Sequence, residues 1–109
     1  MASNGQKIKW SFRASLELVE IEEWLSDQVS EAYAEEYIEG ILEKVEELAD
    51  MPERYGFCRS KKLQEAKIRC INYQKKHIVF YLVKEDIEIL AIIHARRHPS
   101  MFDEIIDDE

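Results

Sequence analysis

The residues best suited to chemistry stand together near the carboxyl end of the chain. There the apolar pair Ile92-Ile93 runs directly into His94-Ala95-Arg96-Arg97-His98-Pro99. Guanidinium groups bind carboxylates and phosphates through paired hydrogen-bond donors. Arginines at the end of a buried strand are therefore suited to binding an anionic group. The pattern predicts an anion-binding or partner-binding edge, and a solvated strand exit whose cations balance nearby acids would give the same pattern.

A second group of cations lies in the middle of the chain: Arg59, Lys61, Lys62, Lys67 and Arg69. Lys67 and Arg69 are two apart, so they share one face if this segment is a strand. This strand and the strand that leads into Arg96-Arg97 are expected to flank a common central strand. We therefore expect the two groups to converge on one concave surface, although scattered, solvated lysines would look alike in sequence.

Other chemistries find little support. His94 and His98 are four apart, which suits a helix face, whereas this region has the pattern of a strand and a turn, so no metal site is predicted there or at His77. Cys58 and Cys70 are too few for a disulfide scaffold and do not form a closely spaced metal pair, so both are interpreted as reduced thiols. No glycine-rich phosphate loop or Ser/His/Asp signature is present, and no cofactor is expected.

Length and charge limit the kind of protein to which these residues belong. The 109 residues are enough for one domain, 1–109, with a flexible tail over 1–6 and an acidic tail over 103–109. The net charge of −8 is segregated: residues 1–50 carry −9, residues 51–98 carry +6, and residues 99–109 carry −5. The absence of a membrane-length apolar run or a secretion signal predicts a cytoplasmic protein.

Hydrophobic spacing predicts the elements that position the cations. Residues 7–13 alternate as a half-buried strand, and two amphipathic helices follow over 14–27 and 30–51, with Ser30 as a cap and Pro52 as the stop. A long connection over 52–66 precedes strands at 67–72, 77–83 and 87–94, and a short helix is expected within 100–107. The fold class is α+β with order β-α-α-β-β-β, a helical hairpin packed on a curved, mainly antiparallel four-stranded sheet.

Several segments together carry a family resemblance. They are Ile8-Lys9-Trp10-Ser11, Leu18-xx-Ile21-xx-Trp24-Leu25, Leu48-xxx-Pro52, Lys67-Ile68-Arg69 followed by His77-Ile78-Val79-Phe80-Tyr81, and Ile87-xx-Leu90-xx-Ile93-His94-Ala95-Arg96-Arg97-His98-Pro99. In order and spacing the chain resembles the toxins of bacterial type II toxin-antitoxin systems, the RelE/ParE superfamily of plasmid stabilisation proteins. The resemblance implies a growth inhibitor neutralised by a cognate antitoxin.

Two mechanisms follow from that resemblance. A RelE-like toxin cuts messenger RNA on the ribosome, which requires a base, a cationic stabiliser and an acid. Here those roles would fall to Lys61, Lys62, Arg69, Arg96, Arg97 and His98. A ParE-like toxin binds DNA gyrase and hydrolyses nothing. Its partner-binding residues here would be Lys67, Arg69, His94, Arg96, Arg97, Met101 and Phe102.

The ParE-like interpretation is favoured. The ending His94-Ala95-Arg96-Arg97 is similar to the ParE-like pattern, and Met101-Phe102 stand where RelE-like ribonucleases often place a Tyr. The net charge of −8 also opposes docking into ribosomal RNA. A domain of the same fold that has lost toxicity and remains a binding module is the third hypothesis.

Overall fold

The computed structural model describes residues 6–97, 102 and 104–107. Its elements are β1 (Ile8–Trp10), α1 (Phe12–Gln28), α2 (Glu31–Glu46) with a 3-10 turn (Glu47–Ala49), α3 (Lys61–Glu65), β2 (Ile68–Tyr73), β3 (His77–Val83), β4 (Ile87–His94) and α4 (Glu104–Asp107). The predicted order is confirmed, with α3 as an addition inside the long connection. Within the described residues, no helix has the length and apolar character needed to cross a membrane.

The four strands form one mixed sheet in the order β1-β4-β3-β2. β2, β3 and β4 are an antiparallel meander, and β1 joins the edge of β4 in parallel, with Ile8 opposite Ile87. The predicted α+β class with a mainly antiparallel sheet is therefore confirmed. β2 and β4 do flank β3, as expected.

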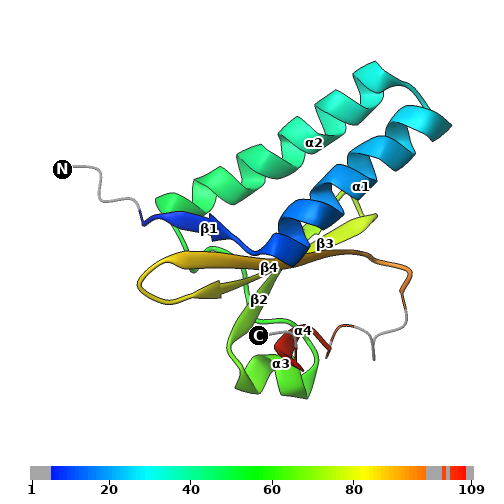
Figure 1. Ribbon diagram of the computed structural model, residues 1–109. Coiled ribbons are helices and arrows are strands. Elements are labelled where there is room, and N and C mark those ends of the chain that lie inside the picture. Colours follow the sequence, from blue (N-terminus) through cyan, green and yellow to red (C-terminus); the bar gives the residue numbers. More distant parts are fainter. Residues whose placement is uncertain (1–5, 98–101, 103, 108–109) are drawn as a thin grey trace.

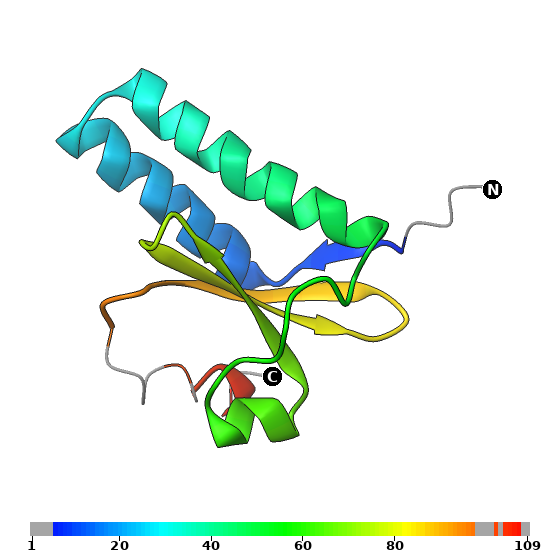
Figure 2. The same cartoon turned by 180° about the vertical axis from the view of Figure 1, so that it is seen from behind.

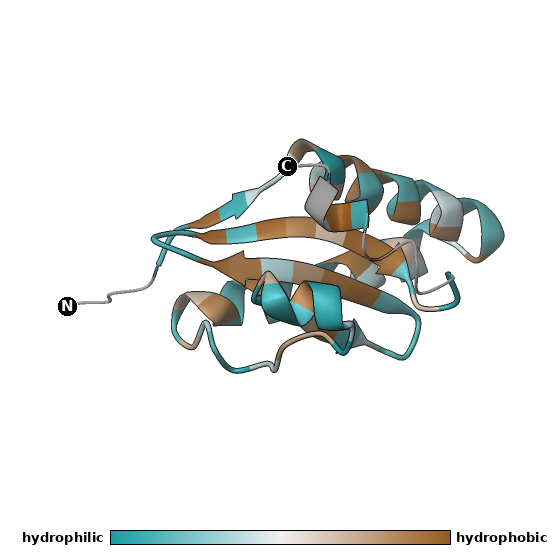
Figure 3. Ribbon diagram, turned by 90° about the horizontal axis from the view of Figure 1, so that it is seen from below, coloured by the Kyte–Doolittle hydropathy of each residue, from teal (hydrophilic) through white to brown (hydrophobic). Residues whose placement is uncertain are grey.

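The helices cover the two faces of the sheet unequally. In Figures 1 and 2 the hairpin of α1 and α2 lies across one side, and the short α3 and α4 lie on the other. Most of the hairpin residues expected to be apolar are buried here: Ala14, Leu25, Ala34, Ile38, Ile41, Val45 and Leu48. A smaller cluster on the far face joins Leu63, Ile68, Phe80, Leu90, Ile93 and Ile105. Figure 3 shows mainly hydrophobic strands between helices of mixed hydropathy.

Serine caps decide where the helices begin. Ser11 Oγ accepts the backbone N–H of Ala14, and Ser30 Oγ accepts that of Tyr33. Because Ser11 starts α1 at Phe12, the strand expected over residues 7–13 ends at Trp10, and that part of the prediction is wrong. The alternation placed Phe12 on the core side, yet its side chain is 84% exposed on the outer face of α1.

Two irregularities shape the end of the sheet that carries His94. The register between β3 and β4 shifts between Phe80 and Tyr81, which pair with Ala91 and Ile89 respectively. The turn from β2 to β3 places Gln74 and Lys75 in the left-handed region, with φ of 51° and 60°. Tight hairpin turns commonly use this conformation, although neither residue is the usual Asn or Gly.

Candidate functional site

The cations at the end of β4 leave the sheet in a tight turn. β4 ends at His94, as predicted for the strand at 87–94, so the strand alternation does not extend to Arg96. Two backbone–backbone hydrogen bonds and one to a side chain hold the turn: Ala95 N–H to Lys76 O at 2.8 Å, Arg97 N–H to His94 O at 3.0 Å, and Arg96 N–H to His94 Nδ1 at 3.0 Å. Both arginines are exposed and lie beside α1.

An open groove of about 510 Å³ runs between α1 and this turn. We call it the β4 groove. Its walls combine cations, acids and apolar side chains: Arg13, Glu17, Glu20, Ile21, Trp24, His77, Ile92, Ile93, His94, Arg96 and Arg97. Sequence reasoning predicted the β4 side of this groove and missed the α1 side. The available signal in the sequence was Trp24, a large apolar residue that follows Glu22 and Glu23. In the structure its side chain is 60% exposed.

Glu17 joins the two walls of the β4 groove. Its Oε1 accepts the backbone N–H of Ile92 at 2.8 Å, and its Oε2 pairs with Arg13 Nε at 3.1 Å. β1 ends at Trp10, so it does not reach this part of β4. A carboxylate from α1 therefore satisfies a backbone donor that a neighbouring strand would otherwise satisfy.

The floor of the β4 groove is a chain of three rings that leads into the core. Tyr37 Oη lies 2.7 Å from His77 Nδ1, and the His77 and His94 rings pack edge to face with centroids 5.1 Å apart. Burial, together with the charges of His94 and Lys76, lowers the pKa of His77 to about 4. Burial and two neighbouring tyrosines raise the pKa of Tyr37.

These pKa shifts leave two of the three rings uncharged. Near neutral pH His77 is neutral and Tyr37 keeps its proton, and the Tyr37 hydroxyl and His77 Nδ1 share one hydrogen bond. An imidazole whose pKa is about 4 is a poor general base at pH 7. The floor is thus suited to holding the end of the sheet together rather than to moving protons.

Arg69 lies at the other end of the sheet. Its Nη1 donates to Tyr55 O at 2.6 Å, and its guanidinium lies 4.3 Å from the centre of the Phe57 ring. Arg69 pairs with Tyr81, and Tyr81 in turn pairs with Ile89. From that level to the end of β4 is on the order of 15 Å along the strand, and Arg96 lies beyond it.

The expected convergence of the two cation groups is therefore wrong. The strands flank β3 as predicted, but the antiparallel meander places the starts of β2 and β4 at the same end of the sheet, so Arg69 and Arg96 lie at opposite ends. Lys61 and Lys62 lie on α3, on the opposite side of the sheet from the helical hairpin. Lys67 has φ of 65° and precedes β2, so the period-two argument does not apply to it.

The cysteines are paired, which corrects their interpretation as reduced thiols. A disulfide joins Cys58 to Cys70. A cavity of about 780 Å³ lies beside it, lined also by Phe80 and by Phe102, whose rings are 5.3 Å apart. Phe102 thus contributes to this cavity and not to the β4 groove. The remaining candidates, His98 and Met101, lie outside the described residues.

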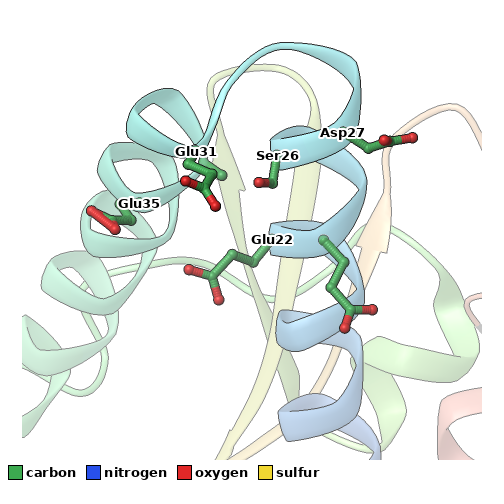
Figure 4. A pocket seen from close by; sticks show the side chains of 7 residues that line it. Glu22, Ser26, Asp27, Glu31 and Glu35 are labelled. Carbon is green, nitrogen blue, oxygen red and sulfur yellow. The ribbon is translucent and has the colours of Figure 1, made fainter.

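Acidic side chains gather at the tip of the helical hairpin. In Figure 4, Glu22 and Ser26 of α1 and Glu31 of α2 point toward the space between the helices, with Asp27 and Glu35 nearby. Among the residues that the structure describes, no group of three or more His, Cys, Asp or Glu is arranged to hold a metal ion. The tip therefore gives the hairpin a negative end, separated from the cations of the turn by Trp24.

Comparisons with known proteins agree with this fold. A sequence model described as "ParE toxin of type II toxin-antitoxin system, parDE" matches residues 8–99. A solved structure, "Chromosomal ParDE TA system from P. aeruginosa", contains a chain similar to this one with a TM-score of 0.72 and 20% identity, covering 86% of this chain and 100% of that chain. At that identity the likeness concerns the fold alone. No curated protein matches the chain.

Proposed function

Since this chain belongs to the ParE toxin family of type II toxin-antitoxin systems, we propose that it inhibits growth by binding DNA gyrase through the β4 groove. A cognate antitoxin neutralises it. Both partners are proteins that meet it in the cytoplasm, and the chain hydrolyses no bond itself.

The separation of the candidate ribonuclease residues carries this proposal. Phosphoryl transfer by a side-chain mechanism requires a base, a cation and an acid around one phosphate. Arg69 is engaged by Tyr55 and Phe57 at one end of the sheet, and Arg96 borders the β4 groove at the other. His77 in the floor of the groove is a weak base, because burial lowers its pKa to about 4. This dispersal favours a binding toxin over a RelE-like ribonuclease.

The β4 groove has the composition of a protein interface. A large, exposed indole and guanidinium groups are the side chains that most often dominate binding energy. Trp24 and Arg96 supply them, and Glu20 adds the opposite charge on the same wall. The groove also borders a part of β4 where β1 no longer pairs, so an extended partner segment can approach the sheet edge.

The acidic hairpin tip supports a protein target over RNA. Glu22, Asp27 and Glu31 lie at the end of the hairpin, next to the Trp24 end of the groove. Phosphate backbones are repelled by such a surface, because affinity for nucleic acid comes mainly from neutralised phosphates. A protein partner with apolar, acidic and basic side chains has no such conflict.

A supercoiling assay tests the proposal. Micromolar purified toxin is expected to inhibit supercoiling by purified gyrase or to trap cleaved DNA. Trp24→Ala and Arg96→Ala are each expected to weaken inhibition by about tenfold, because each removes a groove side chain typical of binding hot spots. Lys62→Ala on α3 is the matched control and is expected to leave inhibition unchanged.

Absence of inhibition by a folded toxin, or equal loss in all three variants, would reject the gyrase proposal. Primer extension on translated messages separates the alternative. Codon-register cuts that Arg69→Ala abolishes would identify a RelE-like ribonuclease, whereas intact messages after induction would exclude it. Normal growth after induction without the antitoxin gene would identify a non-toxic binding module.

A further inference from the structure

A loop segment closes the outer edge of β2. We call residues 52–60 the edge segment. Cys58 N–H donates to Ile68 O at 2.9 Å and Cys70 N–H donates to Gly56 O at 3.2 Å, while Phe57 forms an isolated bridge with Arg69. The segment therefore pairs with β2 over a short antiparallel stretch. The Cys58–Cys70 disulfide links the two covalently at this place.

The disulfide borders a cavity and is not sealed inside the core. Both cysteines line the cavity of about 780 Å³ together with Gly56 and Arg59. The side chain of Cys58 is buried, whereas Cys70 is half-buried. Cys70 is thus the more exposed of the two cysteines for a small thiol that enters the cavity. Arg59 lines the same cavity and adds a positive charge to its wall, and a nearby cation favours the thiolate form of a cysteine.

We propose that Cys58–Cys70 is a reversible redox modification site that dithiol reductants open in the folded protein. A reductant thiolate attacks Sγ of Cys70, the disulfide bond breaks, and Cys58 leaves as a thiolate that takes up a proton. The second thiolate of the reductant then attacks its own sulfur in the mixed disulfide and releases Cys70, which is also protonated. Two electrons and two protons pass to the protein, and the reductant becomes a disulfide.

The state of this site controls how firmly the edge segment holds β2. After reduction the segment keeps two backbone hydrogen bonds, the Arg69 contacts and a hydrogen bond from Tyr81 Oη to Pro52 O at 2.9 Å, but loses its covalent link. An unlinked edge segment opens more often, since the link restricts the chain between residues 58 and 70. Disulfides in a reducing compartment are mostly transient or redox-sensing, which fits a site of this kind.

The rate of reduction under native conditions tests the proposal. The oxidised full-length chain is treated with increasing concentrations of dithiothreitol at neutral pH. Samples are quenched with iodoacetamide, and the fraction of alkylated chain is measured by mass spectrometry. Reduction is expected to rise in proportion to dithiothreitol concentration, without a plateau. A plateau at the rate of global unfolding, or free thiols in protein purified under air, would overturn the proposal, because the pair would then be a closed structural link or no link at all.

Hydrogen exchange tests the consequence for the edge segment. The Cys58 and Cys70 amides are expected to exchange about tenfold faster or more in the reduced chain, while the Ile41 amide in α2 is unchanged. The Cys58→Ser/Cys70→Ser variant is expected to match the reduced chain and to ignore dithiothreitol. Equal exchange of the two amides in oxidised and reduced chains would overturn the claim that the disulfide controls how firmly the edge segment holds β2. Faster exchange throughout the reduced protein would overturn it as well, because the disulfide would then stabilise the whole fold and not this edge.

Discussion

The β2 edge and the β4 edge of the sheet are covered in different ways. At the β2 edge, a loop segment adds backbone pairing, an arginine and a disulfide. At the β4 edge beyond Trp10, the described hydrogen bonds come from the start of α1 and its cap: Ser11 donates to the carbonyls of Ile89 and Leu90, and Glu17 accepts from the Ile92 amide. Unprotected strand edges pair readily with other chains. The β2 edge is thus covered by added backbone pairing and a covalent link, whereas side chains and the cap of α1 cover the β4 edge, which fits the partner site proposed at the β4 groove.

Acid should weaken the β4 end first. The unfolded imidazole of His77 takes up a proton near pH 6.5, whereas the buried one does so only at about pH 4. Between these values the unfolded state holds more protons than the folded state. The free energy of unfolding therefore decreases by up to about 3 kcal/mol as the pH is lowered through this range. Urea unfolding across this range measures the slope. His77→Gln should flatten it, and an equal slope in that variant would assign the loss to other groups.

Arg69→Ala should loosen the β2 end. The variant loses a charged hydrogen bond to Tyr55 O and the contact with the Phe57 ring, for a total of about 2 kcal/mol. Chemical denaturation of the oxidised chain measures this loss. Arg59→Ala is the control, since its side chain only borders the cavity, and it should cost less than about 0.5 kcal/mol. Equal costs would contradict the role given to Arg69.

Glu17→Ala should open the β4 edge by leaving the Ile92 amide without its acceptor. The expected cost is about 1–2 kcal/mol, and Glu17→Gln should cost less because its amide oxygen can still accept. Faster hydrogen exchange at Ile92 is the specific measurement. Glu20→Ala, on the same wall of the β4 groove, should leave that amide unchanged. If both alanine variants act alike, general charge and not the hydrogen bond protects the edge.

Lys75→Gly should strengthen the hairpin beside the β4 groove by about 0.5–1 kcal/mol. The lysine has φ of 60°, which glycine adopts without steric cost. Lys84→Gly in the turn before β4 is the matched control. Lys84 is not in the left-handed region, so glycine there should lower the free energy of unfolding. Thermal unfolding of the two variants should therefore shift in opposite directions.

Most of the fold could be predicted from the sequence because it depends on local periodicity. The four-three spacing from Ala34 to Leu48 and the alternating strands are repeated signals, and each repeat buries apolar surface against the same core. The start of α1 was misplaced because one serine hydroxyl ended the alternation. A single hydrogen bond of this kind leaves little trace in a hydrophobic pattern.

The candidate site was only half predictable, because it depends on contacts between distant residues. The cations of the β4 turn were visible as a local run, but the α1 wall required knowing that Glu17 reaches Ile92 across 75 positions. The pairing of Cys58 with Cys70 likewise depends on a loop folding back on β2. Arg69 was misassigned because β2 and β4 run in the same direction on either side of β3, so the start of β2 and the exit of β4 lie at opposite ends of the sheet.

The register shift between Phe80 and Tyr81 has a consequence for how such a toxin can change. Ile87 and Ile89 face the helical hairpin, and after the shift Ile92 faces it as well, so the side-chain phase of β4 is reversed. That reversal is what brings His94 beside His77. Deleting one residue between positions 89 and 92 would remove the extra residue of the bulge and leave Ile92 and His94 facing the helical hairpin, because Leu90 and Ala91 now lie together on the far face. One codon in this segment can therefore be lost without turning the groove side chains away from α1.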